Sequence, residues 1–572
     1  MNLSIITVNF NTSQLIVNML EILNSITSSP FKFIVVDNGS TPTHLDQLKE
    51  LSQTNNNVFI HGRKQNPSDS ISFSHGSALD EAIKLVDTKY FAVLDSDALF
   101  LVKDWDKILM REINDKCKVI GTPPVGYKDK SFPLIFATLF ETKSYKNLDI
   151  SLKPVPGKES VGFDTGWEMK NKFQSAGLSG KCFRAVSTRH TNKTPYEDII
   201  CAAYYLNGTL VASHFGRGSS SGKAKYYRNL SLPILGSKLK EKKGKKELDK
   251  WIEISSIVAR ESAQTSGIIS YDQLEEVSCP ICNGTEYDPF ITNAKELYNG
   301  INAYFNVVSC NSCKFKFTNP RPKKNYIGKF YPDESGYYQP VISKESKNPL
   351  KRAYRNSKKI LPRSEKENKV LDIGCSWGGW LNEMKSNGWE VYGLEMNSKC
   401  VKVANTQLKL NNVQLFNFEN TLPFESNTFD YINLSMVLEH VFNPEHLLRE
   451  VERVAKKNAV VHISVPNIDG VEFKLYKKHC YGLQVPQHLN HFSKDSIRTL
   501  TEKCGLQIRK YSFHNFDRDM VASAKYSPST SLIFRVLSNS IIRKIFIRNT
   551  VRLLSYLQLT SRMSIYLRKA KN

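Results

Sequence analysis

Residues 369–380 constrain the fold of this chain most, because they predict a strand, a tight turn with glycines and the start of a helix. The apolar run reaches Asp372, and Gly374 and Gly378 follow in the turn. Glycine lets the backbone approach a bound molecule where a Cβ would block it. A strand that feeds into a helix in this way is typical of a parallel α/β sheet with ligands at the carboxyl ends of its strands.

A second predicted strand, residues 389–396, ends in the acidic side chain Glu395. A carboxylate about twenty residues after such a turn can hold the two hydroxyls of a ribose. The turn by itself also fits a dinucleotide, so these residues predict a nucleotide-like cofactor without choosing one.

Residues 90–97 form another apolar run, which ends in Asp95 and Asp97 with one residue between them. A hard cation such as Mn²⁺ or Mg²⁺ prefers oxygen ligands and carries substrate phosphates on its open positions. Pairs of this kind also cap helices and turns, so the pair alone does not decide between the two. Strands predicted at 4–10 and 31–40, with a helix between them, would place Asp37 on the same rim.

Over residues 1–230 the sequence resembles family 2 glycosyltransferases of the GT-A fold. The matching segments are residues 5–11, 35–40, 94–97, 196–199, 206–208 and 213–214. The resemblance implies inverting transfer from a nucleotide-diphosphate sugar. Asp37 and Asp95 would contact the nucleoside, and Asp97 would bind Mn²⁺ or Mg²⁺ under the diphosphate.

The same resemblance implies that His214 completes the metal shell, since a neutral imidazole suits a site with carboxylates. An ordinary core or surface histidine is the alternative. Asp198 is the expected base for the acceptor hydroxyl, with its neighbour Glu197 as the second choice. One departure concerns the Arg-Asn pair that the family usually carries before the acidic pair. This chain has Leu79-Asp80 there, which leaves the diphosphate contacts and the donor unassigned.

Residues 345–525 resemble class I S-adenosylmethionine-dependent methyltransferases, through segments 369–380, 389–396, 429–441, 447–454 and 460–467. The resemblance implies that Asp372, Gly374 and Gly378 line the methionine part of the cofactor and that Glu395 holds its ribose. Ser376 replaces the middle glycine of the loop. Glu419 is the candidate for the adenine contact, because the stretch around it lacks the usual aspartate.

Four cysteines between the two regions form a pair of Cys-x-x-Cys knuckles: Cys279, Cys282, Cys310 and Cys313. This spacing matches a four-thiolate zinc ribbon, a closed site with a structural role. A redox pair, the alternative, normally has one such motif in a strand–helix setting. Residues 310–331 are similar to the ribbon that precedes a group of methyltransferases found with sugar and polysaccharide pathways.

That group also has a histidine-containing segment, which is residues 485–493 here. Methyl transfer to a hydroxyl needs a base, and histidine suits that role near neutral pH. His488 is the first candidate, His491 the second and His440 the third. The alternative is that these histidines only hydrogen-bond loops together.

The chain of 572 residues is longer than one core usually supports and carries a net charge of +24. We predict domains at 1–230 (GT-A), 231–275 (basic linker or helix), 276–322 (zinc ribbon), 323–525 (methyltransferase) and 526–572 (basic amphipathic tail). The tail can lie on an anionic membrane or pack on the methyltransferase. The chain opens on a strand, and no apolar run approaches the length that crosses a bilayer. Eleven cysteines without a disulfide framework favour a reducing compartment.

The sequence therefore predicts a cytoplasmic bifunctional enzyme of polysaccharide or glycoconjugate synthesis, working at the inner face of the membrane if its glycan acceptor is lipid-linked. It would transfer a hexose-type sugar and methylate a sugar oxygen. The main alternative is an RNA-modifying methyltransferase with a non-catalytic sugar-nucleotide-binding domain. Residues 434–437 argue against a nucleic acid partner, because they lack the Asn/Asp-Pro-Pro-aromatic signature of base-amino methylation.

Overall fold

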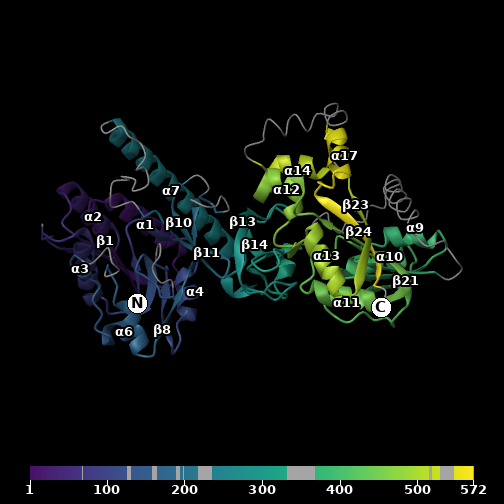
Figure 1. Ribbon diagram of the computed structural model, residues 1–572, viewed down its shortest axis with the longest axis horizontal. Coiled ribbons are helices and arrows are strands. Elements are labelled where there is room, and N and C mark those ends of the chain that lie inside the picture. The colour runs from purple at the N-terminus through teal and green to yellow at the C-terminus, as the bar shows by residue number, and fades with distance from the viewer. Residues whose placement is uncertain are drawn as a thin grey trace. The chain divides into compact units, whose positions relative to one another are not determined.

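The computed structural model of the chain divides into two compact units, Met1–Tyr271 and Asp272–Asn572 (Figure 1). The structure describes residues 1–66, 68–124, 131–157, 164–188, 194–196, 199–216, 235–331, 368–514, 518–527 and 547–570. Each unit has its own sheets and its own hydrophobic core.

The first unit is built on a mixed sheet in which the described residues form seven strands in the order β3-β2-β1-β4-β7-β6-β8. The strands β3, β2, β1 and β4 run parallel, and β7 is antiparallel to both of its neighbours. Their bounds are β1 Leu3–Asn9, β2 Phe31–Asp37, β3 Val58–Gly62, β4 Tyr90–Leu94, β6 Cys117–Gly121, β7 Ala137–Glu141 and β8 Ser179–Cys182. The parallel part confirms the predicted α/β fold and brings the ends of β1, β2 and β4 to one rim.

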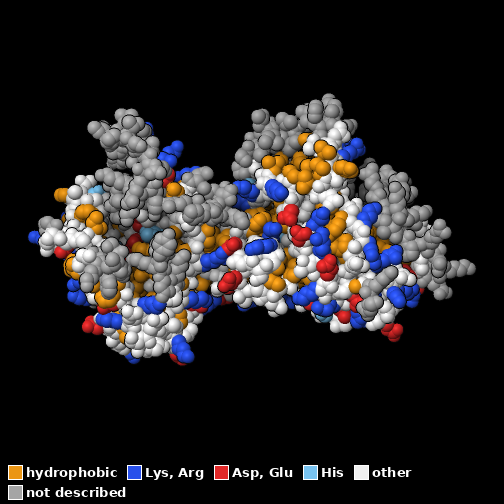
Figure 2. Space-filling model, viewed as in Figure 1, with side chains coloured by type: hydrophobic (Ala, Val, Ile, Leu, Met, Phe, Trp, Pro, Cys, Tyr) orange, Lys and Arg blue, Asp and Glu red, His pale blue; other side chains and the backbone are white. Residues whose placement is uncertain are grey.

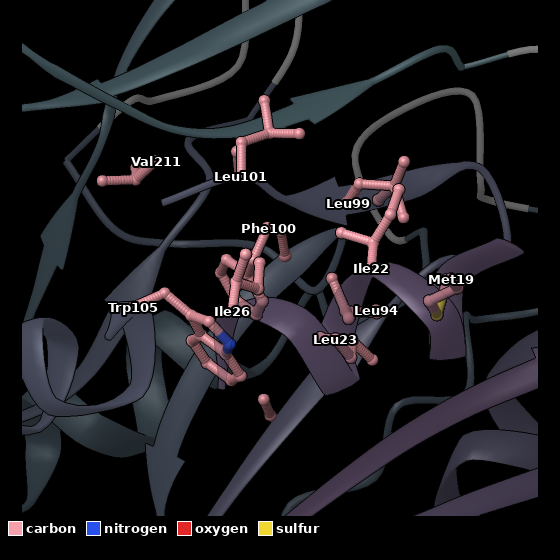
Figure 3. Close-up of a cluster of buried hydrophobic side chains, with 14 of the residues drawn as sticks. Met19, Ile22, Leu23, Ile26, Leu94, Leu99, Phe100, Leu101, Trp105 and Val211 are labelled. Carbon is pink, nitrogen blue, oxygen red and sulfur yellow. The ribbon is translucent and has the colours of Figure 1, made fainter. Parts of the chain in front are cut away.

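A smaller antiparallel sheet, in the order β5-β11-β10-β9, adjoins this rim. Its strands are β5 Ala98–Phe100, β9 Arg184–Ser187, β10 Ala202–Leu206 and β11 Thr209–His214. The helices of the unit are α1 Ser13–Ile26, α2 Pro42–Thr54, α3 Ile71–Lys84, α4 Trp105–Glu112, α5 Thr142–Asn147, α6 Met169–Ser175 and α7 Leu235–Ile268. Apolar residues at helical spacing turn one face of α1 inward, and Figure 3 shows Met19, Ile22, Leu23 and Ile26 of this face in one cluster with Leu94, Leu99 and Phe100.

The helix α7 belongs to the first unit, although the sequence predicted a basic linker or helix over 231–275. Its Trp251 is fully buried in the same core as α1. Ser262 Oγ accepts the N–H of Lys103 at 2.8 Å, and Ser266 Oγ donates to Asp104 at 3.2 Å. These contacts fix the described part of this segment as a structural element of the unit.

The second unit has a central sheet in which seven strands are described, in the order β19-β18-β17-β20-β21-β24-β23. The first five are parallel, and β24 is antiparallel to both of its neighbours. The bounds are β17 Lys369–Ile373, β18 Glu390–Glu395, β19 Val413–Leu415, β20 Phe429–Ser435, β21 Ala455–Pro466, β23 Leu506–Phe513 and β24 Arg562–Lys569. The Rossmann-like order confirms the predicted second α/β domain.

The strand β24 lies between β21 and the edge strand β23 of this sheet, whereas the sequence predicted an amphipathic tail over 526–572. Ile565 pairs with Ile463 of β21 on one side and with Tyr511 of β23 on the other. Residues 563–567 are all buried, so both faces of this strand are covered. The end of the described chain is therefore part of the core of the second unit.

A four-stranded antiparallel sheet, in the order β13-β14-β15-β22, carries the cysteine knuckles. The strands are β13 Tyr287–Lys295, β14 Tyr304–Cys310, β15 Lys316–Thr318 and β22 Asn490–His491, and β12 Leu274–Glu275 pairs separately with β16 Arg321–Pro322. Because β22 comes from the predicted histidine segment, the knuckle region and that segment form one sheet.

The remaining helices of the second unit are α9 Gly379–Lys385, α10 Ser398–Thr406, α11 Pro444–Val454, α12 Val471–Tyr476, α13 Lys494–Lys503, α14 Arg518–Tyr526 and α17 Arg548–Tyr556, with 3₁₀ turns η4 Tyr271–Gln273, η5 Ile327–Phe330, η8 Lys477–His479 and η9 Tyr481–Leu483. Among these helices, α9, α10, α11 and α13 contact strands of the central sheet, whereas α12 and α14 contact each other and the neighbouring 3₁₀ turns (Figure 1). In the described parts of both units, every helix is too short or too polar to cross a membrane.

Candidate functional site

The acidic pair of the first unit meets a histidine at the rim of the sheet. Asp95 and Asp97 follow β4, and the pairing of β5 with β11 sets His214 opposite Ala98. His214 Nε2 lies 3.2 Å from Asp97 Oδ1 and 3.9 Å from Asp95 Oδ2. One ligand atom from each of the three side chains lies within 4.8 Å of the others, so the group can surround one cation.

The charge of His214 is set by its acidic neighbours. Burial by itself would lower the pKa of this imidazole, but the charge and hydrogen bond of Asp97, followed by the charge of Asp95, raise it above the usual value. The ring also stacks on Phe136, with the centroids 4.7 Å apart. The imidazole thus pairs with the Asp97 carboxylate and lies in the field of Asp95.

A second histidine, which the sequence analysis did not select, faces the same acidic pair. His75, on α3, has its Nε2 3.4 Å from Asp95 Oδ1. Burial would lower its pKa, yet the hydrogen bond and charge of Asp95, with Asp97 and Asp164, raise it. A cationic group here can oppose the charge of a bound diphosphate. The sequence feature that could have identified His75 is its position one helical turn before Leu79-Asp80.

Asp80 has a structural partner instead of a ligand-facing position. Its carboxylate accepts the Leu152 N–H and the Ser151 hydroxyl, both at 2.8 Å. A Cβ at Gly76, one turn earlier, would lie 2.4 Å from the Leu152 carbonyl oxygen. The helix α3 therefore packs directly on this loop, and Asp80 fastens the contact.

Asp37 is buried at the end of β2, beside the end of β1. Asn9 donates to its Oδ1 at 2.8 Å, and the Ser40 N–H donates to its Oδ2 at 3.1 Å. Both contacts orient the carboxylate at the rim. The other predicted side chains, Asp198 and Glu197, lie outside the described residues. Tyr196, just before them, is anchored by hydroxyl contacts with Ser213 at 3.0 Å and Ser255 at 2.9 Å.

In the second unit, the glycine turn after β17 wraps around Glu395. Gly374 and Gly378 have φ values of +75° and +80°, and a Cβ at Gly374 would lie 2.4 Å from Val437 Cγ2. The two oxygens of Glu395 accept the N–H groups of Ser376 and Asn397, each at 2.9 Å. The acid at the end of β18 is thus fixed beside the turn, where a ribose would lie.

Asp372 lies next to this turn in a buried position. Asn433 on β20 donates to its Oδ1 at 2.7 Å, and His462 Nδ1 lies 2.7 Å from the Asn433 oxygen. Burial raises the pKa of Asp372 to about 7, and Glu395 adds to the rise while the Asn433 hydrogen bond opposes it. The carboxyl group therefore changes charge near neutral pH. Glu419, the predicted adenine contact, accepts the Phe442 N–H at 2.7 Å.

The three candidate histidines fall into two groups. His440 and His488 lie against each other, with ring centroids 4.7 Å apart, and together with Glu439 they form a second cluster with ligand atoms within 4.8 Å. His491 instead lies 3.1 Å from the Thr318 hydroxyl, which ties β22 to β15. Burial lowers the pKa of His440 to about 4 and that of His491 to about 3. Neither imidazole is cationic at neutral pH.

His440 also lines a small pocket. The other lining side chains are Tyr298, Asn299, Phe330, Tyr331, Gln484 and Gln487. The Gln487 amide nitrogen donates to Glu296 and to the Phe330 carbonyl, each at 3.0 Å, while its Oε1 has no described partner. Aromatic faces beside amide groups can bind a small polar molecule.

Two family models match this chain. Residues 4–166 match the model described as glycosyl transferase family 2, and residues 347–511 match the model described as a methyltransferase domain. The chain joins a family 2 glycosyltransferase domain to a methyltransferase domain. This confirms both resemblances and places Asp97 inside the first match and Glu395 inside the second.

The methyltransferase domain is also similar to curated proteins. A demethylmenaquinone methyltransferase of Listeria welshimeri is 33% identical over 128 residues, which are 20% of this chain and 54% of that protein. A ubiquinone biosynthesis O-methyltransferase of Glaesserella parasuis is 28% identical over 149 residues, 25% of this chain and 61% of that protein. The chain thus spans little more than half the length of these relatives.

Among solved structures, an S-adenosylmethionine-dependent methyltransferase of Methanosarcina mazei is 18% identical and has a TM-score of 0.26. That overlap covers 36% of this chain and 95% of the other. A complex of the Trm112 methyltransferase activator of Haloferax volcanii with a methyltransferase has a TM-score of 0.30 at 16% identity, and covers 40% of this chain and 94% of the other.

The four predicted cysteines next to the methyltransferase domain come together. The sulfur atoms of Cys279 and Cys313 lie 3.5 Å apart, as do those of Cys282 and Cys310, and all four are free thiols. Zinc–sulfur bonds of about 2.3 Å in a tetrahedron put the sulfurs about 3.8 Å apart. The cluster is therefore compatible with the predicted structural zinc ion.

Proposed function

We propose that the glycosyltransferase domain transfers a sugar from a nucleotide-diphosphate donor with inversion, and that the methyltransferase domain methylates a sugar oxygen with S-adenosylmethionine. The observation that carries the first half is the cluster of Asp95, Asp97 and His214, which suits a cation bound to a diphosphate. The second half is supported by Glu395 and the glycine turn, which fit a nucleoside and a methionine chain.

In the first domain, a divalent cation such as Mn²⁺ or Mg²⁺ would supply charge stabilisation for the leaving diphosphate. Asp97 and His214 would hold it, while Asp37 and Asp95 would orient the nucleoside. Asp198, with Glu197 as the second choice, would accept the proton of the attacking hydroxyl. His75 would lie on the diphosphate side, where the chain lacks the usual arginine.

In the second domain, S-adenosylmethionine supplies an electrophilic methyl group when bound. Asp372 and Glu395 would orient it from the ends of β17 and β18. The pocket beside His440 would hold the acceptor: Tyr298, Phe330 and Tyr331 offer aromatic faces for the apolar side of a sugar ring, and the free Gln487 Oε1 can accept a hydroxyl. In this proposal both domains of one chain act on glycans. The enzyme would therefore serve polysaccharide or glycoconjugate synthesis.

Contact with an anionic membrane from the cytoplasmic side is part of this proposal and would suit a lipid-linked acceptor. The helix α17 exposes Leu553 and Tyr556 together with Arg552, and Leu557 just after it is exposed as well; Figure 2 shows hydrophobic side chains gathered over this part of the second unit. Co-sedimentation with anionic vesicles is expected for the full chain and should weaken when Leu553 and Leu557 become serine. Equal sedimentation of both proteins would contradict the contact.

The proposed function is tested by the intact mass of glycans from cells that lack this protein. We expect the simultaneous loss of one hexose-type unit and one methyl group. Restoring the chain with Asp97→Asn should leave the hexose absent, whereas Glu395→Gln should restore the hexose and leave out the methyl group. Unchanged glycans in the cells without the protein would overturn the proposal. Saturable retention of mixed RNA on filters at moderate salt would favour the RNA alternative instead.

A further inference from the structure

The cluster of Glu439, His440 and His488 has three ligand groups without partners. Glu439 and His488 are almost fully buried, and both Glu439 oxygens and the Nε2 atoms of both histidines lack hydrogen-bond partners among the described residues. Leaving a buried carboxylate and two imidazole nitrogens unpartnered is costly, by about 1–3 kcal/mol for each neutral group and more for a charge. A bound ligand would remove this cost.

The opposite side of each imidazole is occupied in a way that suits metal binding. His488 Nδ1 lies 3.0 Å from the Gly482 carbonyl oxygen, and His440 Nδ1 lies 3.0 Å from the Gln487 carbonyl oxygen. Because a carbonyl only accepts, each Nδ1 that bonds to its carbonyl carries the hydrogen, with the Tyr331 hydroxyl as a second contact of His440 Nδ1, and the Nε2 of each ring then keeps a lone pair for a ligand. An N–H donated to a backbone carbonyl is the usual support of a metal-bound histidine.

Backbone pairing holds these residues in place before any ligand arrives. The Glu439 carbonyl accepts the N–H groups of Leu489 at 2.8 Å and Asn490 at 3.0 Å. The Asn490 side chain donates to the Val441 carbonyl at 2.7 Å. The segments that carry Glu439-His440 and His488 are therefore fastened to each other on both sides of the cluster, which preorganises it.

The cluster lies close to both expected reactants of the second domain. Val437, two residues before Glu439, is the side chain that a Cβ at Gly374 would strike, so the segment begins against the cofactor turn. His440 lines the pocket proposed for the acceptor, and its Nδ1 also contacts the Tyr331 hydroxyl at 2.8 Å. The segment that carries the cluster therefore adjoins both the glycine turn and the pocket proposed for the acceptor.

We propose that Glu439, His440 and His488 bind one first-row divalent cation, which leaves open positions for the oxygen of the methyl acceptor. Two imidazoles and one carboxylate are a ligand set for zinc, iron or manganese, and three protein ligands leave room for a substrate atom. The acceptor role rests on the proposed methyltransferase function, but the binding of the ion does not.

The bound cation would lower the pKa of the acceptor hydroxyl, so that its proton passes to solvent. A lone pair of the oxygen then forms the bond to the methyl carbon while the carbon–sulfur bond breaks. The electron pair of the carbon–sulfur bond goes to sulfur, which leaves as the neutral thioether. In this proposal His440 and His488 are metal ligands that hold the ion through neutral nitrogen atoms. The sequence had predicted that they act as a general base.

The test counts ions on the full chain with Asp97→Asn as the background, which removes the cation site of the first domain. One sample is titrated with Mn²⁺ and free ion is followed by electron paramagnetic resonance, since a hard ion does not replace thiolate-bound zinc. A second is dialysed against Zn²⁺ and counted by mass spectrometry. We expect one further ion beyond the zinc of the cysteine cluster, with at least one of the two metals. Added Glu439→Gln or His488→Gln should each abolish it.

The matched control is His479→Gln, a partly buried histidine of the same unit outside the cluster, which should keep the further ion. Circular dichroism and S-adenosylmethionine titration of each variant show that the domain remains folded. Absence of the further ion with both metals, or its persistence in both cluster variants, would overturn the metal site. Failure to bind S-adenosylmethionine with the ion present would instead refute the proposed methyltransferase function alone.

Discussion

The two carboxylate–histidine clusters of this chain differ in how their members are bonded. In the first unit, two aspartates surround His214, which already lies 3.2 Å from Asp97. In the second unit, one glutamate meets two histidines whose Nδ1 atoms bond to backbone carbonyls, and in His440 also to the Tyr331 hydroxyl, but not to each other. The first cluster can satisfy itself by sharing a proton, whereas the second keeps its ligand atoms bare.

If both clusters bind a cation as proposed, the difference predicts two uses of it. A cluster of carboxylates at the rim of a sheet suits an ion that arrives with a diphosphate and leaves with it. A buried set with preformed imidazole tautomers suits an ion that stays. The predictions that follow test whether the two units really work with separate ligands, from the largest expected effect to the smallest.

Asp97→Asn should reduce sugar transfer by about 10³-fold, because loss of a cation ligand removes several kcal/mol of charge stabilisation from the leaving diphosphate. Binding of S-adenosylmethionine should not change. Steady-state assays with nucleotide sugars and Mn²⁺ measure the first effect. The exposed acid Asp46 gives the control Asp46→Asn, which should behave as the unmodified chain. Equal activity in both variants would remove Asp97 from the site.

Ile565→Ala should lower the free energy of unfolding of the second unit by about 2–5 kcal/mol, the cost of a large-to-small change in a core strand. The first unit should be unaffected. Calorimetry can resolve the two transitions, and a shift with added S-adenosylmethionine identifies the second. Arg568→Ala, at an exposed position of the same strand, should leave both transitions in place. A silent Ile565→Ala would mean that β24 is not part of the core.

Glu395→Gln should weaken S-adenosylmethionine about 10- to 100-fold, since a hydrogen bond to a charged group contributes about 1.5–3 kcal/mol. The amide keeps one oxygen where the carboxylate has two, so one of the N–H donors of Ser376 and Asn397 loses its acceptor. Titration calorimetry measures the affinity. Glu390→Gln, at the exposed start of β18, is the control, and an affinity equal in the two variants would refute the role of Glu395.

The affinity for S-adenosylmethionine should rise about tenfold between about pH 6 and about pH 8. Burial raises the pKa of Asp372 to about 7, so the group is mostly neutral below that pH and ionised above it. The cofactor carries positive charge and favours the ionised form, which makes binding stronger as pH rises. Across this pH range, the measured affinity for S-adenosylmethionine should rise for the unmodified chain and stay constant for Asp372→Asn. A slope that persists in the variant would assign the titration to another group.

The sequence predicted the sites wherever the signal was local. Asp95, Asp97 and Asp372 follow apolar runs directly, and the ends of neighbouring parallel strands meet at one edge. The four cysteines carried their own spacing. Their roles as ligands remain predictions, but the structure brings them together.

The sequence did not show contacts between distant segments. The strand β24 was read as part of an amphipathic tail, because basic residues flank its buried run, residues 563–567. The cluster around Glu439 joins segments that lie almost fifty residues apart, and only their backbone pairing reveals it. His75 faces the acidic pair from a helix, where no strand end pointed to it.

The central claim, two independent transfer pockets in one chain, is tested most directly by titration calorimetry of the unmodified protein with both donors. We predict that one S-adenosylmethionine and one nucleotide-diphosphate hexose bind per chain, the second only with Mn²⁺, and that neither changes the affinity of the other. Binding of neither S-adenosylmethionine nor any UDP-, GDP- or dTDP-hexose, or competition of the two donors for one site, would contradict it.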